Sequence, residues 1–210
     1  MFVPEVYTPQ DPVWITELIT GNPLAILTTS EPGACPKATH VPTIPEGKLK
    51  PDNLVGSVIL GHMNRLNPHW ARLRDGAEAL LIFQGPHSYV SPTHYQTCPA
   101  APTWNFTSVH VQGSLTVIRG REQTLSIVKQ TVAAYEGSHG TGWDMSESLG
   151  YFQRLLPGVG AFRLVIEKVD SMFKLSQEQQ HEVWQRTVDV FGGRQPALAD
   201  LMRRARPDGR

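Results

Sequence analysis

The chain has 210 residues, 40% of them hydrophobic, which is long enough for one domain with a substantial core. Its 19 Lys and Arg balance its 19 Asp and Glu, so it lacks the overall basic charge typical of nucleic-acid-binding domains. It also lacks the roughly 18 consecutive apolar residues of a membrane span and a signal-peptide pattern, so we expect a cytoplasmic protein without nucleic-acid or membrane partners.

In chain order, the spacing of apolar residues and of turn residues predicts a series of elements. They are a helix at 11–20, strands at 24–29, 37–42, 54–60 and 77–83, a turn and a short strand at 84–92, a long strand at 104–118, helices at 121–136 and 145–156, a strand at 159–169, and two polar helices near the C-terminus. Strands predominate early and are joined by short turns. This order favours an α+β fold built on an antiparallel β-barrel decorated with helices over alternating parallel units.

The stretch 61–70 holds more groups suited to a binding site than any other part of the sequence. It contains His62, Arg65 and His69, together with two asparagines. It directly follows the strand predicted at 54–60, and the end of a strand is a rigid place from which to project a side chain. We therefore predict that this stretch forms one wall of a cofactor site. The sequence has no GxGxxG or Walker motif, so a phosphate-binding nucleotide fold has no support.

Several short motifs together resemble the PaiB-like family, whose members are often described as FMN-binding negative transcriptional regulators. The motifs lie at 1–4, 39–42, 61–63, 67–70, 83–87, 89–92, 102–106, 109–110 and 174–177. The resemblance implies the split β-barrel fold of pyridoxamine-phosphate oxidases. It also implies a homodimer with the cofactor at its seam. We expect a cofactor-binding domain at 1–178 and a C-terminal helical extension at 179–210.

Three further segments, 142–145, 156–163 and 172–179, are similar to piperazate synthases, a haem-dependent branch of this family in bacterial secondary metabolism. This likeness implies haem b as cofactor and N5-hydroxy-L-ornithine as substrate, cyclised to L-piperazic acid by N–N bond formation with loss of water. The chemistry is physically reasonable, because iron can act as a Lewis acid on the N–OH group. A base must keep the attacking amine neutral, and the departing oxygen needs a proton.

The resemblance and the residue chemistry together give candidate roles in the stretch 61–70. His62 is our first choice for the axial iron ligand, since His is the commonest such ligand; the alternative is a histidine hydrogen-bonded in a barrel seam. His69, on the following helix beside Trp70, is the second choice and is otherwise a packed or surface residue. Arg65 is expected to bind a haem propionate, an FMN phosphate or the substrate carboxylate, because its guanidinium makes two-pronged contacts with such groups. The alternative for Arg65 is an exposed ion pair.

Four residues outside this stretch complete the candidate site. Lys37 is expected to act as a proton donor on the open side of the cofactor, with a surface lysine as the alternative. Trp104 is placed to stack on a flat cofactor, although an aromatic in an alternating strand is more often a core residue. Lys174 and Gln177 follow the last strand and are expected to bind the cofactor across a dimer seam, with a surface loop as the alternative.

Three other functions remain open from sequence. The first is a flavin-binding split barrel, either an oxidoreductase or a redox-sensing regulator, for which Arg65 fits equally well. The second is a haem-degrading oxygenase, because related split barrels have that activity. The third is a transcriptional regulator without catalysis, which the zero net charge and the lack of a helix-turn-helix pattern disfavour.

Overall fold

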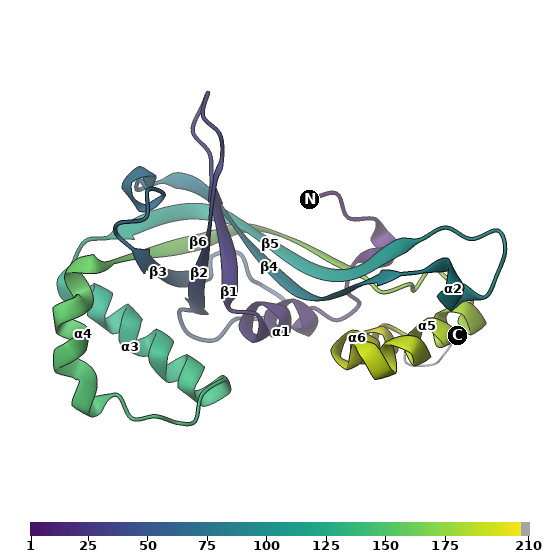
Figure 1. Cartoon of the computed structure of the whole chain (residues 1–210). Coiled ribbons are helices and arrows are strands. Elements are labelled where there is room, and N and C mark those ends of the chain that lie inside the picture. Colours follow the sequence, from purple (N-terminus) through teal and green to yellow (C-terminus); the bar gives the residue numbers. More distant parts are fainter. Residues whose placement is uncertain (207–210) are drawn as a thin grey trace. The chain divides into compact units, whose positions relative to one another are not determined.

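The computed structural model describes residues 1–206, and among these residues six strands form a closed barrel in the order β1-β2-β3-β6-β5-β4 (Figure 1). The strands are β1 (Leu24–Thr29), β2 (Lys37–Pro45), β3 (Val58–Asn64), β4 (Ala77–Val90), β5 (Thr103–Ile118) and β6 (Val159–Lys174). β1 pairs with β2 and β4, and β3 pairs with β2 and β6, all in antiparallel register. The predicted antiparallel barrel decorated with helices is confirmed.

The helices follow the predicted order. They are α1 (Val13–Gly21), α2 (Pro92–Tyr95), α3 (Arg121–Ser138), α4 (Leu149–Leu155), α5 (His181–Arg194) and α6 (Pro196–Ala205), with short 3-10 turns η1 (Glu5–Tyr7), η2 (Trp70–Arg72), η3 (Ser146–Ser148) and η4 (Leu156–Gly158). Within the part of the chain that the structure describes, no helix is both long and apolar enough to cross a membrane.

The chain divides into two compact units, and each is discontinuous in sequence. One unit, which we call the central unit, consists of residues 22–83 and 110–169. The other, which we call the terminal unit, consists of residues 1–21 and 84–109 and of the chain from residue 170 onward. β4, β5 and β6 each contribute residues to both units. The predicted division at residue 178 remains a prediction.

The core of the central unit forms where α3 packs against β2 and β3. The buried side chains of this contact are Ile44, Leu60, Ile118, Ile127 and Ala161. Ile127 lies on α3, and each of the other four comes from a different strand, so the cluster joins the helix to four strands of the barrel. α3 therefore covers part of the outer face of the barrel and leaves the neighbouring part of β2 and β3 for another role.

Two local predictions were wrong. The strand predicted at 54–60 is shifted to β3, because Leu54 accepts a hydrogen bond from the Ser57 N–H in a turn around Gly56, whose φ is +84°. Where a turn and a separate short strand were predicted at 84–92, residues 84–90 instead continue the strand β4. Gly85 lies so close to its neighbours that an added Cβ would be 2.3 Å from Thr107 Oγ1. Tertiary packing thus overrides the local Gly-Pro turn signal.

Candidate functional site

A pocket lies where β2 and β3 separate. The two strands pair only over residues 43–45 of β2 and 59–61 of β3. Before this region β2 pairs with β1, whereas β3 pairs with β6 along its whole length, from Val58 to Asn64. The pocket at this separation has a volume of about 610 Å³, within the range of about 300 to 1,000 Å³ that is typical of ligand sites. We call it the split pocket, and it is lined by Thr39, His40, Pro42, His62, Met63, Asn64, Asn67, Leu155, Gly158 and Val159.

His62 is the residue of the split pocket with the clearest chemical potential. It lies inside β3, opposite Ala161 of β6, and not beyond the strand end as predicted. Burial lowers the pKa of its imidazole, so the ring is neutral near pH 7. Its Nδ1 atom is buried and has no hydrogen-bond partner among residues 1–206. Buried polar atoms are nearly always paired, and a neutral imidazole is the form that binds metals, so the His62 ring is a candidate ligand.

Two glycines hold the backbone around His62 in a close-packed arrangement. Gly61 lies opposite Phe162, and a Cβ added to it would be 2.3 Å from the Phe162 ring. A Cβ added to Gly160 would lie 2.5 Å from the ring of Trp70. Each aromatic ring therefore fills the space that a side chain would otherwise take. This packing fixes the direction in which His62 leaves the strand.

His69 is buried, with only 2% of its surface exposed, and both of its ring nitrogens are used. Its Nε2 lies 2.9 Å from Thr29 Oγ1, and its Nδ1 lies 2.9 Å from Thr39 Oγ1. Burial is the main cause that lowers its pKa, and the charges of Lys37 and Arg72 lower it further. Because neither nitrogen is available to a metal, the geometry favours His62 over His69 as the ligand.

Arg65 lies at the edge of a second hollow, of about 170 Å³, which is also lined by Arg119 and Arg121. The Arg65 Nε donates to the Val159 carbonyl at 2.8 Å, and its guanidinium lies 5.8 Å from the centre of the Trp70 ring. These contacts hold Arg65 in place while leaving its terminal nitrogens for another partner. The hollow adjoins the N-terminus of α3 and is suited to an anion.

Lys37 pairs with Thr29 across the β1–β2 ladder. Its charge acts on His69, as the lowered pKa of that imidazole indicates. In the described chain it is not among the residues that line the split pocket. Its predicted role as a proton donor therefore stays a prediction. In the structure, the positive charge of Lys37 lies close enough to buried His69 to lower the pKa of that imidazole.

Trp104 belongs to the terminal unit and is half exposed. Its ring lies 5.7 Å from that of His87 and 6.1 Å from that of Tyr89, measured between centroids. The alternation predicted for β5 is present, because Asn105 and the residues in phase with it are buried while Trp104 faces outward. An exposed aromatic group of this kind can stack on a planar ligand, and its role as a cofactor contact stays a prediction.

Lys174 and Gln177 also belong to the terminal unit, where both bind neighbouring groups. Lys174 Nζ donates to Thr103 Oγ1 at 2.5 Å and lies 5.6 Å from the centre of the Tyr7 ring. Gln177 Oε1 accepts from the Leu175 N–H at 2.6 Å. Its Nε2 donates to the carbonyls of Phe173 and Val6, at 2.6 and 2.9 Å. These bonds order the chain after β6, whether or not the residues also bind a cofactor.

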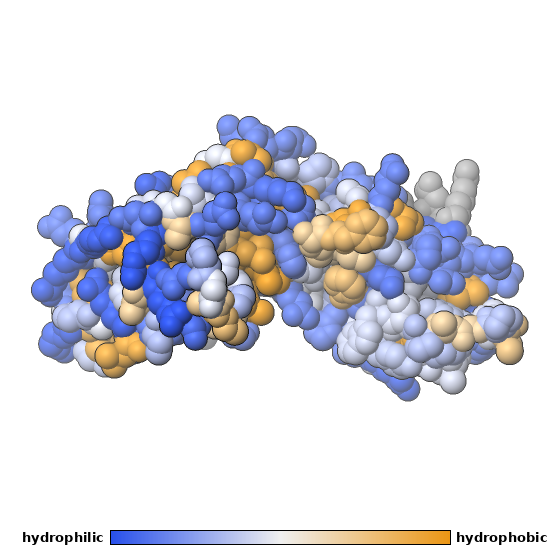
Figure 2. Space-filling model, turned by 90° about the horizontal axis from the view of Figure 1, so that it is seen from above, coloured by the Kyte–Doolittle hydropathy of each residue, from blue (hydrophilic) through white to orange (hydrophobic). Residues whose placement is uncertain are grey.

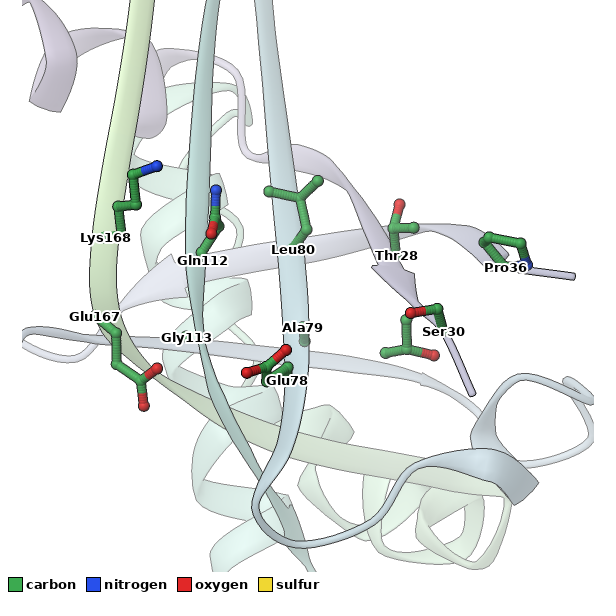
Figure 3. A pocket seen from close by; sticks show the side chains of 11 residues that line it. Thr28, Ser30, Pro36, Glu78, Ala79, Leu80, Gln112, Gly113, Glu167 and Lys168 are labelled. Carbon is green, nitrogen blue, oxygen red and sulfur yellow. The ribbon is translucent and has the colours of Figure 1, made fainter. Parts of the chain in front are cut away.

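A third hollow, of about 340 Å³, lies across the neighbouring strands β6, β5, β4 and β1 of the central unit (Figure 3). Figure 3 shows Glu78 and Glu167 on either side of Gly113, with Lys168, Gln112, Leu80 and Thr28 in the next row. No sequence motif pointed to this surface. Across residues 1–206, no group of three or more His, Cys, Asp or Glu is placed to hold a bare metal ion. A metal held mainly by its own macrocycle needs fewer protein ligands.

The surface around these hollows is mixed in character. Figure 2 shows hydrophobic patches in several separate places among hydrophilic residues on the face that it draws. Leu155, which lines the split pocket, is 48% exposed. The split pocket thus combines an apolar edge with the polar groups of His40, His62 and Asn67, a combination typical of small-molecule sites.

Comparison with known proteins gives a consistent result. Residues 1–168 match the model of a family described as "Putative FMN-binding domain". The chain is 27% identical over 192 residues to "Protease synthase and sporulation protein PAI 2" of Bacillus subtilis, covering 90% of this chain and 88% of that protein. It is similar in fold to the FAD and haem binding protein of Mycobacterium smegmatis, with a TM-score of 0.56, 16% identity and coverage of 81% of this chain and 74% of the other.

A second similar structure is the flavocytochrome Anf3 of Azotobacter vinelandii, with a TM-score of 0.51 and 12% identity. That match covers 76% of this chain and 65% of the other. At these identities the two structures show the fold, a split barrel, and their own printed descriptions name a flavin or a flavocytochrome and, for the first, haem.

Proposed function

Because this chain belongs to the FMN-binding split-barrel family, whose model matches residues 1–168, we propose that its split pocket binds a planar cofactor, that this cofactor is haem b, and that His62 is the axial ligand. The observation that carries the proposal is the buried, neutral His62 with a ring nitrogen that has no partner among residues 1–206. A haem iron takes an axial ligand from the protein, most commonly a histidine, and a neutral imidazole is suited to that role.

We further propose that the protein cyclises N5-hydroxy-L-ornithine to L-piperazic acid with loss of water. Bound haem would supply a Lewis acid that weakens the N–O bond without net redox chemistry. The apolar edge formed by Leu155 and Val159 would exclude water, which strengthens polar interactions inside the pocket. Asn64 and Asn67 would orient the amine, and Arg65 would bind an anionic group of substrate or cofactor.

The narrower likeness of segments 142–145, 156–163 and 172–179 to piperazate synthases supports this reaction over other haem chemistry. A homodimer with the cofactor at its seam, a cytoplasmic location and a role in secondary metabolism belong to the same proposal. In such a dimer, the cofactor bound by one chain would be contacted by Trp104, Lys174 and Gln177 of the other chain.

The test is turnover without oxygen or reductant. Haem-loaded protein is incubated anaerobically with N5-hydroxy-L-ornithine, and the product is followed by mass spectrometry and by chromatography against synthetic piperazic acid. The proposal predicts a cyclic product that is lighter than the substrate by one water. Unchanged substrate contradicts it, and oxygen-dependent loss of the haem itself would indicate a haem-degrading oxygenase instead.

A second candidate is an FMN-dependent protein, and the hollow lined by Arg65, Arg119 and Arg121 favours it. Each guanidinium is held in place: Arg119 pairs with Asp75 at 2.6 Å, and Arg121 donates to the Gln153 carbonyl at 2.9 Å. A phosphate would find several free N–H groups there. Purified protein with a two-banded yellow spectrum that is lost in Arg65→Ala would support FMN, and a single intense Soret band would support haem.

A further inference from the structure

Behind the split pocket, a buried imidazole joins two threonine hydroxyls from neighbouring strands. His69 lies between Thr29 of β1 and Thr39 of β2, at 2.9 Å from each hydroxyl oxygen. Thr39 and Asn67 both line the split pocket, and the Asn67 carboxamide donates to Thr39 Oγ1 at 3.4 Å. The main-chain N–H of His69 in turn donates to Asn67 Oδ1 at 2.9 Å, and this bond orients the backbone that carries the His69 ring.

The donors and acceptors of this chain are complementary. A hydroxyl has one proton to donate and two lone pairs to accept with. With the ring proton on Nε2, His69 donates to Thr29, and its Nδ1 accepts the hydroxyl proton of Thr39. Thr39 Oγ1 then accepts from Asn67 with one lone pair and keeps the other for a ligand. The Thr39 hydroxyl therefore has a base, His69, within hydrogen-bond distance. Thr29 in turn orients the His69 ring.

The charges around His69 keep it in the state that a base requires. Burial is the largest cause of its lowered pKa, and the positive charges that face it are Lys37 of β2 and Arg72 of η2. Arg72 is itself 3.6 Å from Glu31 in a half-exposed ion pair. The ring is therefore neutral near pH 7, and once protonated it is a stronger acid than an ordinary histidine, which helps it to return the proton.

We propose that Thr39 is the proton-exchanging hydroxyl of the split pocket, and that His69 and Thr29 are the positioning residues that make it one; this rests on the proposed function. The substrate ammonium gives a proton to Thr39 Oγ1 as Thr39 passes its own proton to His69 Nδ1. The freed amine attacks the N–OH nitrogen, and the N–O electron pair leaves with the oxygen. The proton then returns from His69 through Thr39 to the departing hydroxide, which leaves as water.

This sequence uses no oxidant or reductant and leaves the protein in its starting protonation state. The new N–N bond forms as the N–O bond breaks, and the second proton of the attacking nitrogen is lost to solvent or kept by the product according to pH. The structure thus explains how one hydroxyl serves as both the base and the acid that the reaction requires.

The test compares four variants in haem-loaded protein. Thr39→Val keeps the shape and deletes the hydroxyl, Thr39→Ser restores the hydroxyl, and Thr29→Val removes the partner on the far side of the ring. Thr43→Val is the matched control, because Thr43 is a buried threonine of the same strand whose hydroxyl donates to the Pro23 carbonyl at 2.9 Å. We expect Thr39→Val to lower kcat about 100-fold with KM and the haem spectrum unchanged, Thr39→Ser to recover most of the rate, and Thr43→Val to stay within about twofold.

Two readouts distinguish a proton-exchanging role from a structural one. The wild-type kcat should fall at acid pH as His69 becomes protonated. In Thr39→Val, kcat should no longer fall at acid pH, because the proton no longer passes through His69. In haem-free protein, ¹⁵N NMR should show His69 neutral at pH 7 with the proton on Nε2, and the Nδ1 resonance should shift in Thr39→Val when its hydrogen-bond donor is lost. The NMR measurement does not depend on any activity.

Three results would overturn the inference: a wild-type rate in Thr39→Val, a Thr39→Ser variant no faster than Thr39→Val, or a His69 ring that carries its proton on Nδ1 or is charged at pH 7. A wild type that forms no cyclic product would instead end the proposed function. Equal product from wild type and Thr39→Val would end this inference alone.

Discussion

The stretch 61–70 of the central unit and the segment 174–177 of the terminal unit both carry motifs of the family, but their polar groups are used differently. In the first, His62 Nδ1 is buried beside a pocket and has no partner among the described residues. In the second, Lys174 and Gln177 bind hydroxyl and carbonyl groups of their own unit. A family motif alone therefore does not separate residues that build the fold from residues that act on a ligand.

An unpaired nitrogen is informative only when it also borders a pocket. In the terminal unit, His94 Nδ1 and Trp184 Nε1 are likewise buried without a partner among residues 1–206. Their rings pack against aromatic neighbours, with His94 5.8 Å from Phe191 and Trp184 5.9 Å from His181 between centroids. Among residues 1–206, His62 alone combines an unpaired ring nitrogen with a place in the lining of a pocket of ligand size. The predictions below test this contrast between the units.

The largest effect is expected in the terminal unit, from Asn105→Leu. Asn105 is fully buried, and its carboxamide exchanges two hydrogen bonds with the Ser176 hydroxyl, at 2.9 and 3.0 Å. The substitution leaves Ser176 buried without that partner, which should lower the free energy of unfolding by about 2 to 3 kcal/mol in urea titrations. Haem affinity should stay unchanged. Gln185→Leu, an exposed change in the same unit, should stay within about 0.5 kcal/mol.

A smaller effect is expected from Gly160→Ala in the central unit. The new methyl group would meet the Trp70 ring at 2.5 Å, and such overpacking should lower the free energy of unfolding by about 1 to 2 kcal/mol. Because Gly160 pairs with Met63, which lines the split pocket, haem affinity should fall as well. Gly150→Ala, where nothing lies within 4 Å of the added carbon, serves as the control. Equal stability of the two variants would contradict this packing account.

Lys174→Met tests whether the segment 174–177 is structural. Loss of the bond to Thr103 should lower the free energy of unfolding by about 1 kcal/mol, while haem affinity stays within about twofold. Haem affinity is measured by absorption titration, and stability by urea unfolding of the same sample. A loss of haem at unchanged stability would contradict a purely structural role of the segment 174–177. It would support the predicted role of Lys174 as a cofactor residue across a dimer seam.

The smallest effect concerns pH. His62 and His69 have lowered pKa values in the folded protein, so the unfolded chain binds protons more readily as the pH falls below about 6.5. Stability from these two groups is therefore fully present above that pH and is lost as the pH falls toward their folded pKa values. The Tm should drop between pH 7.5 and pH 5.5, and it should drop less in His69→Gln. An equal or larger drop in His69→Gln would contradict this.

The sequence predicts the order of elements well because their signals are local. Alternation in β5 and the turns around β1 and β2 need no tertiary information. The position of β3 was wrong because a glycine with positive φ, Gly56, delays the strand. Of the site, the stretch 61–70 stood out because it groups two histidines, an arginine and two asparagines within ten residues.

Thr29 and Thr39 were missed for the opposite reason. Threonines in alternating strands look like ordinary strand residues, and only the pairing of β1 with β2 brings the two hydroxyls to the same ring. His69 was predicted on a helix, whereas it precedes the single turn η2 and is buried. A contact between residues distant in sequence leaves no local sequence signal. The separation of β2 from β3, which forms the split pocket, likewise has no local sequence signal.

The proposal for the split pocket is that the imidazole of His62 holds a haem iron there. The most direct test is a haem titration of haem-free wild type, His62→Ala and His40→Ala, followed by the Soret band, with His40 as a control from the same pocket. The account predicts saturable binding by wild type and His40→Ala, and affinity at least about 100-fold weaker in His62→Ala with an unchanged unfolding midpoint. Equal haem binding by His62→Ala and wild type would contradict it.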